Sequence, residues 1–280
     1  MATNFSWNSR FALVLAAILL AGCVPAPTPQ PLRVQVQRIG YGEPRQPNVP
    51  HTLRNRGMWH YDWSPICANG NVPMVYTGID PWTAEEVSRC RNMNEPVLMI
   101  GNEPEWGNQS DWTPEYAADV IAYYNARWDG EIWCCGTLST HLGFVNRIYE
   151  SYVSRYGEWP VDRLHIHVYA NDGFTASMPF DFGWVEDNRR QVERHVKWLR
   201  ERGLPERIIV SECCLLSNDA TADEYITTMD TYMRMLRGFP AVESVAWFSS
   251  YYYAWRGANL TDRAGRLTPV GEAWLDWRWR

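Results

Sequence analysis

The chain has 280 residues, a length that suits one large domain, and its formal net charge at pH 7 is -6. Charged residues make up 21% of the sequence and form no basic run, which excludes a surface built to follow a phosphate backbone, so we expect no nucleic-acid partner. Aromatic residues reach 14%, with 16 Trp, and we expect most of them to fill the core and a minority to bind a ligand by stacking.

The N-terminal residues have the pattern of a bacterial lipoprotein signal. Arg10 precedes an apolar run over 11–21, and small residues then lead to Cys23. The run is too short for a confident membrane span. We therefore predict a signal peptide over residues 1–22, lipidation of Cys23, and a protein held by that lipid at a membrane face outside the cytoplasm, either the cell surface or the periplasmic face.

A proline-rich segment follows the predicted lipidation site. Prolines at 25, 27, 29 and 31 fix φ and keep this stretch extended. We assign residues 23–53 to the lipidated cysteine and a stiff tether, and residues 54–280 to the folded domain.

From residue 57 onward, short apolar runs alternate with amphipathic stretches, which is typical of a parallel sheet covered by helices. The predicted fold is an α/β (β/α)8 TIM barrel in which one strand is degenerate, with residues 32–36 as a candidate, or the barrel is irregular. An open doubly wound sheet is the alternative, although no Gly-rich turn follows an early strand. The predicted strands are 57–63, 73–77, 97–101, 132–137, 164–169, 208–211 and 245–249, and the predicted helices are 83–92, 113–128, 142–156, 185–202 and 222–236.

Two glutamates stand where apolar strands end. Glu103 precedes Pro104, which favours an extended backbone at Glu103, and Glu212 ends the apolar run 208–211, where a bare carboxylate would be costly. Two carboxylates at two strand ends are what acid-assisted cleavage of a glycosidic bond needs. We predict that Glu103 is the general acid and then the base, and that Glu212 is the nucleophile. The alternatives are a helix-entry role for Glu103 and an arginine ion pair for Glu212.

The strand predicted over 164–169 places His165, His167 and Tyr169 on one side, because side chains alternate along a strand. A His-x-His pair suggests zinc, but a hydrolytic zinc site needs a third ligand and an open position. We predict no metal site and a buried core role for His165. Further predicted sugar contacts come from other strand ends, with Trp247 as the pocket floor and Trp63 and Trp106 as walls, together with Asn102, His167, Tyr169 and Asp62.

Taken in order, these motifs resemble the retaining (β/α)8 hydrolases of glycoside hydrolase clan A, and they are most similar to family 128, the endo-β-1,3-glucanases. The resemblance covers residues from about Gly57 to Trp274. We expect no cofactor, because the two carboxylates carry the chemistry. The resemblance implies that Glu103 is the acid/base, Glu212 the nucleophile, Asn102 the partner of the sugar 2-hydroxyl and Trp247 the stacking platform. The segments that carry it are Trp59 to Pro65, Asn102-Glu103-Pro104, His167-Val168-Tyr169, Ser211-Glu212 and Trp247-Phe248.

The sequence departs from the family pattern beside the motifs. Ser211 stands where the family has Thr, Cys213-Cys214 where it usually has Phe-Gly, and Asp62 where Asn is common. The two adjacent cysteine pairs, 134–135 and 213–214, lack the CxxC spacing of a zinc or redox site. In an oxidising compartment we expect a structural bridge, for which one between the two pairs is a candidate, or buried thiols. Six cysteines leave the pairing open: Cys67, Cys90, Cys134, Cys135, Cys213 and Cys214.

Together these features predict a monomeric, membrane-tethered glycoside hydrolase that cleaves a β-linked polysaccharide with retention, with endo-β-1,3-glucan cleavage as the best specific assignment. A non-catalytic carbohydrate-binding lipoprotein on the same scaffold is the main alternative. A metal-dependent hydrolase built on His165, His167 and an acidic partner is the weaker one.

Overall fold

The computed structural model describes residues 38–43, 53, 56, 58–67, 71–90, 96–170, 183–217, 219–253 and 256–277. The predicted signal peptide, Cys23 and the strand candidate 32–36 lie outside these residues. Among the helices that the structure describes, none combines the length and hydropathy needed to cross a membrane.

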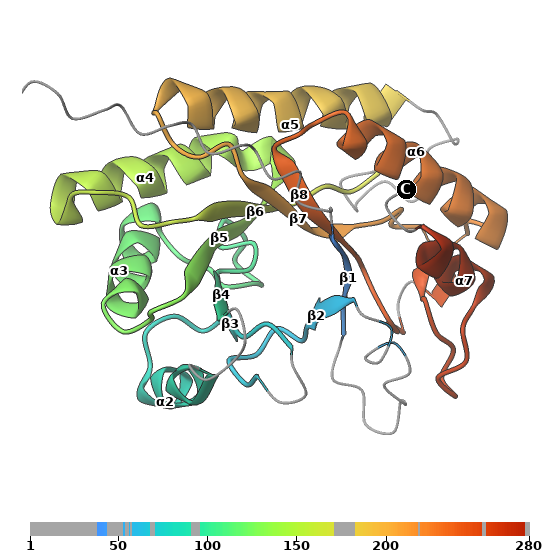
Figure 1. Cartoon of the computed structure of the whole chain (residues 1–280), viewed down its shortest axis with the longest axis horizontal. Helices are drawn as coiled ribbons and strands as arrows, with labels where there is room; N and C mark the ends of the chain where they lie inside the picture. Colours follow the sequence, from blue (N-terminus) through green and yellow to red (C-terminus); the bar gives the residue numbers. More distant parts are fainter. Residues whose placement is uncertain are drawn as a thin grey trace, which may run out of the picture. The chain divides into compact units, whose positions relative to one another are not determined.

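Eight parallel strands form one sheet within the described residues, and they curl into a nearly closed barrel with helices between them (Figure 1), which confirms the predicted fold class. Their order is β2-β1-β8-β7-β6-β5-β4-β3. The seam between β2 and β3 is bridged by backbone hydrogen bonds from Val72 N to His60 O (2.8 Å) and from Met74 N to Ser64 O (2.7 Å). The strands are β1 (Arg38–Gly42), β2 (Trp59–Tyr61), β3 (Met74–Val75), β4 (Val97–Ile100), β5 (Glu131–Leu138), β6 (Arg163–His167), β7 (Ile208–Cys213) and β8 (Val242–Trp247).

The strand missing from the sequence prediction is β1, which pairs with β2 on one side and β8 on the other. It lies inside the segment 23–53 that was predicted to be a tether, so that domain boundary is wrong and the barrel begins by residue 38. Two of its five residues are glycines. A Cβ at Gly40 would lie 2.4 Å from the Trp59 ring, so the glycine allows Trp59 to pack directly on the strand backbone. The apolar side chain at this position of the sheet is therefore Trp59 of β2, and β1 itself contributes only backbone there.

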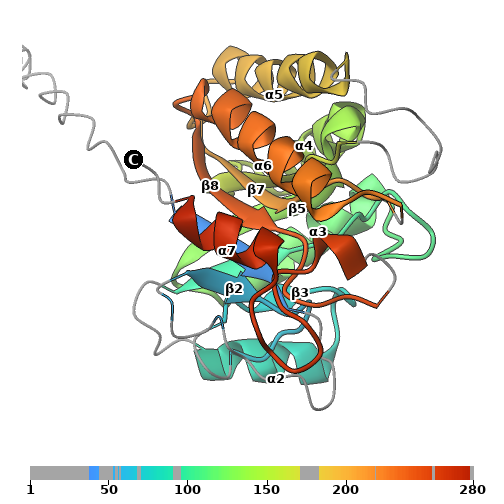
Figure 2. The same ribbon diagram turned by 90° about the vertical axis from the view of Figure 1, so that its right-hand side faces the viewer.

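Helices cover the outside of the barrel (Figure 2), and their beginnings follow capping chemistry. The side chains of Asp80, Thr113, Thr221 and Thr268 each accept a backbone N–H of the first helical turn. Proline occupies the first turn after three of these caps, where its missing N–H costs nothing. The helices are α2 (Pro81–Arg89), α3 (Pro114–Asn125), α4 (Leu142–Tyr156), α5 (Gly183–Glu201), α6 (Ala222–Arg237) and α7 (Pro269–Asp276), with short η4 (Ser139–His141) and η5 (Arg256–Ala258).

Ion pairs occupy the N-terminal end of the barrel. Arg163 opens β6 and pairs with Glu131 of β5 and with Glu243 of β8, at 2.6 Å for the second pair. Arg207, just before β7, pairs with the same Glu243 at 2.7 Å. The Arg163 side chain is only 8% exposed, so these charges compensate one another inside the barrel. The C-terminal end of the barrel is where a fold of this kind places its functional side chains.

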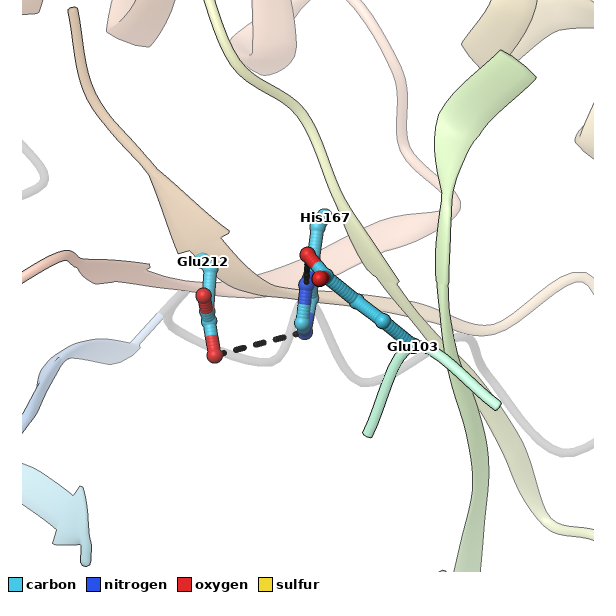
Figure 3. Close-up of side chains that lie close together, drawn as sticks. All are labelled: Glu103, His167 and Glu212. Carbon is cyan, nitrogen blue, oxygen red and sulfur yellow. Dashed lines mark hydrogen bonds and ion pairs between the residues drawn. The ribbon is translucent and has the colours of Figure 1, made fainter. Parts of the chain in front are cut away.

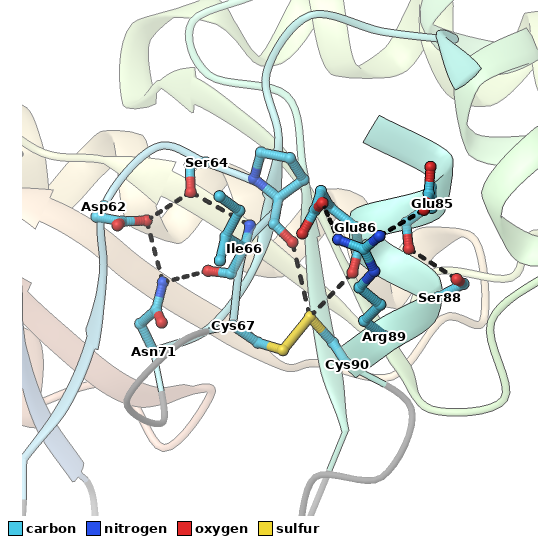
Figure 4. Close-up of a disulfide and its surroundings, with 11 residues drawn as sticks. Asp62, Ser64, Ile66, Cys67, Asn71, Glu85, Glu86, Ser88, Arg89 and Cys90 are labelled. Carbon is cyan, nitrogen blue, oxygen red and sulfur yellow. Dashed lines mark hydrogen bonds and ion pairs between the residues drawn. A yellow bond between two sulfur atoms is a disulfide. The ribbon is translucent and has the colours of Figure 1, made fainter. Parts of the chain in front are cut away.

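The cysteines resolve into three arrangements. A disulfide joins Cys67, in the loop after β2, to Cys90 at the end of α2 (Figure 4). Cys134 is bonded to its neighbour Cys135 on β5, whereas Cys213 and Cys214 are free buried thiols. Burial raises the pKa of the Cys213 thiol far above its usual value. The suggested bridge between the two adjacent pairs is therefore wrong, and the alternative of buried thiols holds for the second pair.

Candidate active site

Glu103, His167 and Glu212 meet at the C-terminal ends of β4, β6 and β7, of which β6 and β7 are adjacent and β4 is separated from β6 by β5 (Figure 3). Glu103 follows β4, His167 is the last residue of β6, and Glu212 is the penultimate residue of β7. Nδ1 of His167 lies 2.9 Å from Oε1 of Glu103, and its Nε2 lies 3.5 Å from Oε1 of Glu212. One oxygen of each carboxylate lies within 4.8 Å of the other. The structure thus brings together the two glutamates that the sequence singled out.

Three donors hold the Glu212 carboxylate, which is 3% exposed. Tyr61 Oη donates to its Oε1 at 2.9 Å, and Trp63 Nε1 donates to the same oxygen at 3.0 Å. Tyr169 donates to Oε2. Burial and the charge of Glu212 raise the pKa of both tyrosines well above the usual value, so they keep their protons and remain donors. The carboxylate is therefore fixed in orientation on both oxygens.

Opposing effects set the ionisation of Glu212. Burial raises its pKa, and the nearby charge of Glu103 raises it further. The charge of His167 and the hydrogen bonds from Tyr169 and Tyr61 lower it, but the net direction is upward. The donors around this carboxylate therefore offset part of the cost of keeping an anion in a buried site.

His167 is fully buried and responds in the opposite sense to an isolated buried histidine. Burial alone lowers its pKa, but the charge of Glu212 and the hydrogen bond and charge of Glu103 outweigh it, so the pKa is raised. His165, two residues earlier, has neither neighbour. Its Nδ1 lies 3.0 Å from Ser211 Oγ and its Nε2 lies 3.3 Å from the carbonyl of Ile100. Burial and the charge of His167 lower the pKa of His165 to about 3, so it is a neutral core histidine, as predicted.

The backbone is strained at two site residues. Glu103 has φ of 44° and Trp63 has φ of 53°, values in the left-handed region that residues other than glycine seldom adopt. Such conformations cost on the order of 1–3 kcal/mol each and gather at functional sites. The prediction that Pro104 would impose an extended backbone on Glu103 is therefore wrong. A hydrogen bond from Glu103 N to Gly136 O (2.7 Å) ties this turn to β5.

Glu103, His167 and Glu212 present ligand atoms close enough together to hold a metal ion. Both oxygens of Glu212 also accept hydrogen bonds from phenol or indole donors, so protein groups hold this carboxylate in place. The metal hydrolase built on His165 and His167 finds no support, because both nitrogens of His165 have protein partners. The donor set suits a carboxylate that reacts as an anion.

Residues 39–274 match the model of a protein family described as the glycosyl hydrolase catalytic core. The chain belongs to this family. The predicted enzyme class, a glycoside hydrolase, is thereby confirmed. A search of curated proteins found no match.

Solved structures similar to this glycosyl hydrolase include three glucanases of glycoside hydrolase family 128. A subgroup I endo-β-1,3-glucanase from Amycolatopsis mediterranei, in complex with laminaritriose, is 19% identical with a TM-score of 0.66, over 86% of this chain and 99% of the other. A subgroup II endo-β-1,3-glucanase from Sorangium cellulosum is 18% identical (TM-score 0.64; 85% and 97%). A subgroup III curdlan-specific exo-β-1,3-glucanase from Blastomyces gilchristii, in complex with glucose, is 20% identical (TM-score 0.61; 85% and 97%). They share the barrel fold of this chain.

Asn102 lies beside the glutamates of this glycosyl hydrolase, as predicted, and its amide is oriented on both sides. Its Oδ1 accepts from Trp63 Nε1 at 3.1 Å, and its Nδ2 donates to Gln109 Oε1 at 3.1 Å. The same Gln109 oxygen accepts from Tyr76 Oη at 2.8 Å. Sequence reasoning missed Gln109 and Tyr76. It also missed Tyr61, although Tyr61 lies within the Trp-rich motif of β2.

Trp247 does not form the floor of a pocket, so this prediction is wrong. Its side chain is fully buried, and its Nε1 donates to the carbonyl of Ala258 at 2.7 Å. Its ring packs on Trp274 of α7, with centroids 5.7 Å apart, because odd positions at the end of β8 point outward to the helices. The next residue, Phe248, faces the site instead. Its ring lies 5.7 Å from that of Trp63 and 6.3 Å from that of Tyr169.

The two other predicted contacts lie in loops. Asp62 follows β2, and its Oδ1 accepts from Ser64 Oγ and Asn71 Nδ2, both at 3.0 Å (Figure 4), so it orders the loop before β3. Trp106 is half-buried in the loop after β4, with its ring 6.5 Å from that of His141. The backbone N–H of Trp106 donates to the carbonyl of Glu103 at 2.9 Å and so ties the two residues within one turn. Of the predicted contacts, Asn102, His167, Tyr169 and Trp63 join the cluster.

Proposed function

We propose that the chain is a retaining glycoside hydrolase of β-1,3-glucan in which Glu212 is the nucleophile and Glu103 the acid/base. The observation that carries the mechanism is the pairing of the two carboxylates, with an oxygen of each within 4.8 Å of the other. Retaining enzymes place their carboxyl groups about 5–5.5 Å apart, whereas inverting enzymes need about 6.5–9.5 Å to admit a water. The narrow spacing supports double displacement through a glycosyl-enzyme intermediate.

The two glutamates differ in ways that support different roles. The Glu212 side chain is 4% exposed and held by three donors, which suits a nucleophile that must attack from one direction. The Glu103 side chain is 15% exposed, so it can protonate a departing sugar and later activate an incoming water. His167 contacts both carboxylates and can stabilise whichever of them is ionised as the proton moves.

The substrate assignment draws on the relatives and on the walls of the site. Endo-β-1,3-glucanases with the same barrel bind laminaritriose or laminaripentaose. In this chain, Trp63, Tyr169 and Phe248 supply aromatic surface around Glu212, and Asn102 supplies an amide that suits a sugar hydroxyl. We assign endo cleavage, which a broad distribution of product lengths at early times would support.

The test is hydrolysis of a panel of glucans by the wild type and by Glu103→Gln and Glu212→Gln. We expect the wild type to cleave β-1,3-glucan with retention, which NMR of the anomeric protons of the product would detect. Each variant should lose at least about 1,000-fold in turnover rate. A matched control is Glu105→Gln, which alters a carboxylate in the same loop that bonds His141 instead of His167. Inversion, or near wild-type turnover in either catalytic variant, would contradict the mechanism.

We further propose that the protein is an extracytoplasmic lipoprotein, monomeric and anchored through Cys23. The lipobox sequence carries this proposal, and the Cys67–Cys90 disulfide supports it because such bonds persist in oxidising compartments. Metabolic labelling with a radioactive fatty acid should mark the wild type and leave Cys23→Ala unlabelled. Equal labelling of both proteins would contradict the anchor.

A further inference from the structure

Three large apolar side chains gather beside the catalytic edge and face solvent. Trp82 is 53% exposed, and Ile79 and Tyr116 are each 37% exposed. They come from the loop after β3, the first turn of α2 and the first turn of α3. We call these three residues the Trp82 patch. They are half of the six exposed large apolar residues in the described part of the chain, which makes their proximity notable.

The loop that presents the Trp82 patch is held at several points. Ile79 N donates to Tyr116 Oη at 3.1 Å, and Tyr124 Oη donates to the carbonyl of Gly78 at 3.1 Å. Asp80 accepts from Thr83 N at 2.9 Å and from Thr77 Oγ1 at 2.9 Å. An exposed tryptophan on a fixed loop loses little freedom on binding, so its apolar surface is available for a partner at low entropic cost.

The loop that carries Ile79 begins beside the active site. Tyr76 directly follows β3, three residues before Ile79, and its Oη bonds to Gln109, which in turn accepts from Asn102. The charges nearest the patch are acidic on balance, because Asp80 caps α2 and the single Arg89 binds both Glu85 and Glu86. Aromatic surface beside an acidic excess repels a nucleic acid or an anionic lipid and accepts a neutral polymer.

We propose that the Trp82 patch is a distal binding site for β-glucan, which takes the part of a long chain that extends beyond the catalytic cleft. The indole of Trp82 stacks on the apolar face of a pyranose ring, with Ile79 and Tyr116 beside it. The site rests on the proposed function, since its ligand is the same polymer. It gives the enzyme a preference for long or insoluble chains that the residues around Glu212 alone do not provide.

The test measures binding in the Glu103→Gln background, which prevents digestion of the ligand. Trp82→Ala should weaken binding to insoluble β-1,3-glucan particles about five- to tenfold, the effect typical of removing an aromatic anchor. Laminaritriose, which we expect to bind at the residues around Glu212 alone, should lose less than about twofold in affinity. Trp82→Phe keeps a stacking ring and should recover most of the particle binding.

The matched control is Tyr156→Ala, which removes a 46% exposed aromatic residue at the far end of α4 and should bind particles like its parent. Thermal melts of all variants exclude unfolding. Equal particle binding by Trp82→Ala and its parent overturns this inference alone, provided that the wild type cleaves β-1,3-glucan. Absence of any such cleavage overturns the proposed function and the distal site with it. Trp82-dependent binding to phosphatidylcholine vesicles, without an effect on glucan, assigns the patch to a membrane and also overturns the inference.

Discussion

Nδ1 of His167 lies 2.9 Å from Oε1 of Glu103, so the imidazole hydrogen-bonds the less buried of the two glutamates. Its other nitrogen faces Glu212 at 3.5 Å. A fully buried ring between two carboxylates is favoured in its protonated form, which is the reason for the raised pKa of His167. The charge of His167 in turn lowers the pKa of Glu212, so a change at His167 alters the ionisation of that carboxylate.

The contribution of His167 to stability should depend on pH. Because its folded-state pKa is raised, its stabilising effect is fully present below the unfolded value of about 6.5 and is lost as pH rises through the folded value. We expect wild type to exceed His167→Gln in free energy of unfolding at pH 6, with a gap that narrows on the alkaline side. Urea unfolding between pH 6 and 9 measures it. A gap that widens with pH would refute the charged state of His167.

The tyrosines that donate to Glu212 should tune its ionisation. Tyr61→Phe and Tyr169→Phe each remove a hydrogen bond that lowers the pKa of Glu212, so that pKa should rise further. We expect the acidic limb of kcat/KM to move to higher pH and the maximum rate to fall about tenfold, or ~1.4 kcal/mol. The control is Tyr152→Phe, a buried tyrosine packed on Trp159 away from the site. An unshifted acidic limb in both donor variants would count against this role.

Trp247 and Phe248 should show opposite effects when truncated. Trp247→Ala removes a fully buried indole from the core and should cost about 3–5 kcal/mol in the free energy of unfolding. Phe248→Ala should cost less stability but raise KM for β-glucan, because its half-buried ring lies against Trp63 and Tyr169. Chemical denaturation and substrate saturation curves separate the two effects. The reverse pattern would restore Trp247 as the stacking residue.

The Cys67–Cys90 disulfide should stabilise the protein by about 3 kcal/mol, the value typical of a closed loop of this length. The two cysteines are 23 positions apart and tie the loop after β2 to the end of α2. Replacing both with serine avoids an unpaired thiol and should lower the unfolding midpoint in non-reducing buffer. Cys213→Ser, which alters a free buried thiol, serves as a comparison. Dithiothreitol should lower the midpoint of the wild type more than that of the double variant, which keeps the Cys134–Cys135 bond.

The sequence could predict the elements whose own residues carry the signal. β4 is an apolar run, β7 begins with one and β8 ends with one, and Glu103 and Glu212 stand out because each closely follows such a run. β1 could not be found in this way, because Gly40 has no side chain and the ring of Trp59, from another strand, packs in the space beside it. Its strand character depends on a partner that only the folded chain provides.

The two glutamates of the site could be predicted from the sequence, but the directions in which the aromatic side chains around them point could not. Strands of a barrel are buried on both faces, so apolar character does not tell whether Trp247 or Phe248 points to the site. The register between β7 and β8 also shifts between Val210 and Cys213, which removes a simple alternation rule. Gln109 lies in a polar loop and gains its role only through contacts with Asn102 and Tyr76.

The seam of the barrel joins its shortest strands, the three residues of β2 and the two residues of β3. A stretch with so few ladder bonds opens locally at a lower free energy than the long strands opposite, and its amide protons exchange sooner with solvent. Tyr61 and Trp63, which both donate to Glu212, lie at this seam. Opening there would release two donors from the carboxylate at once. Local opening between β2 and β3 is therefore coupled to the hydrogen bonding of Glu212. A bound sugar chain would shift this equilibrium toward the closed state.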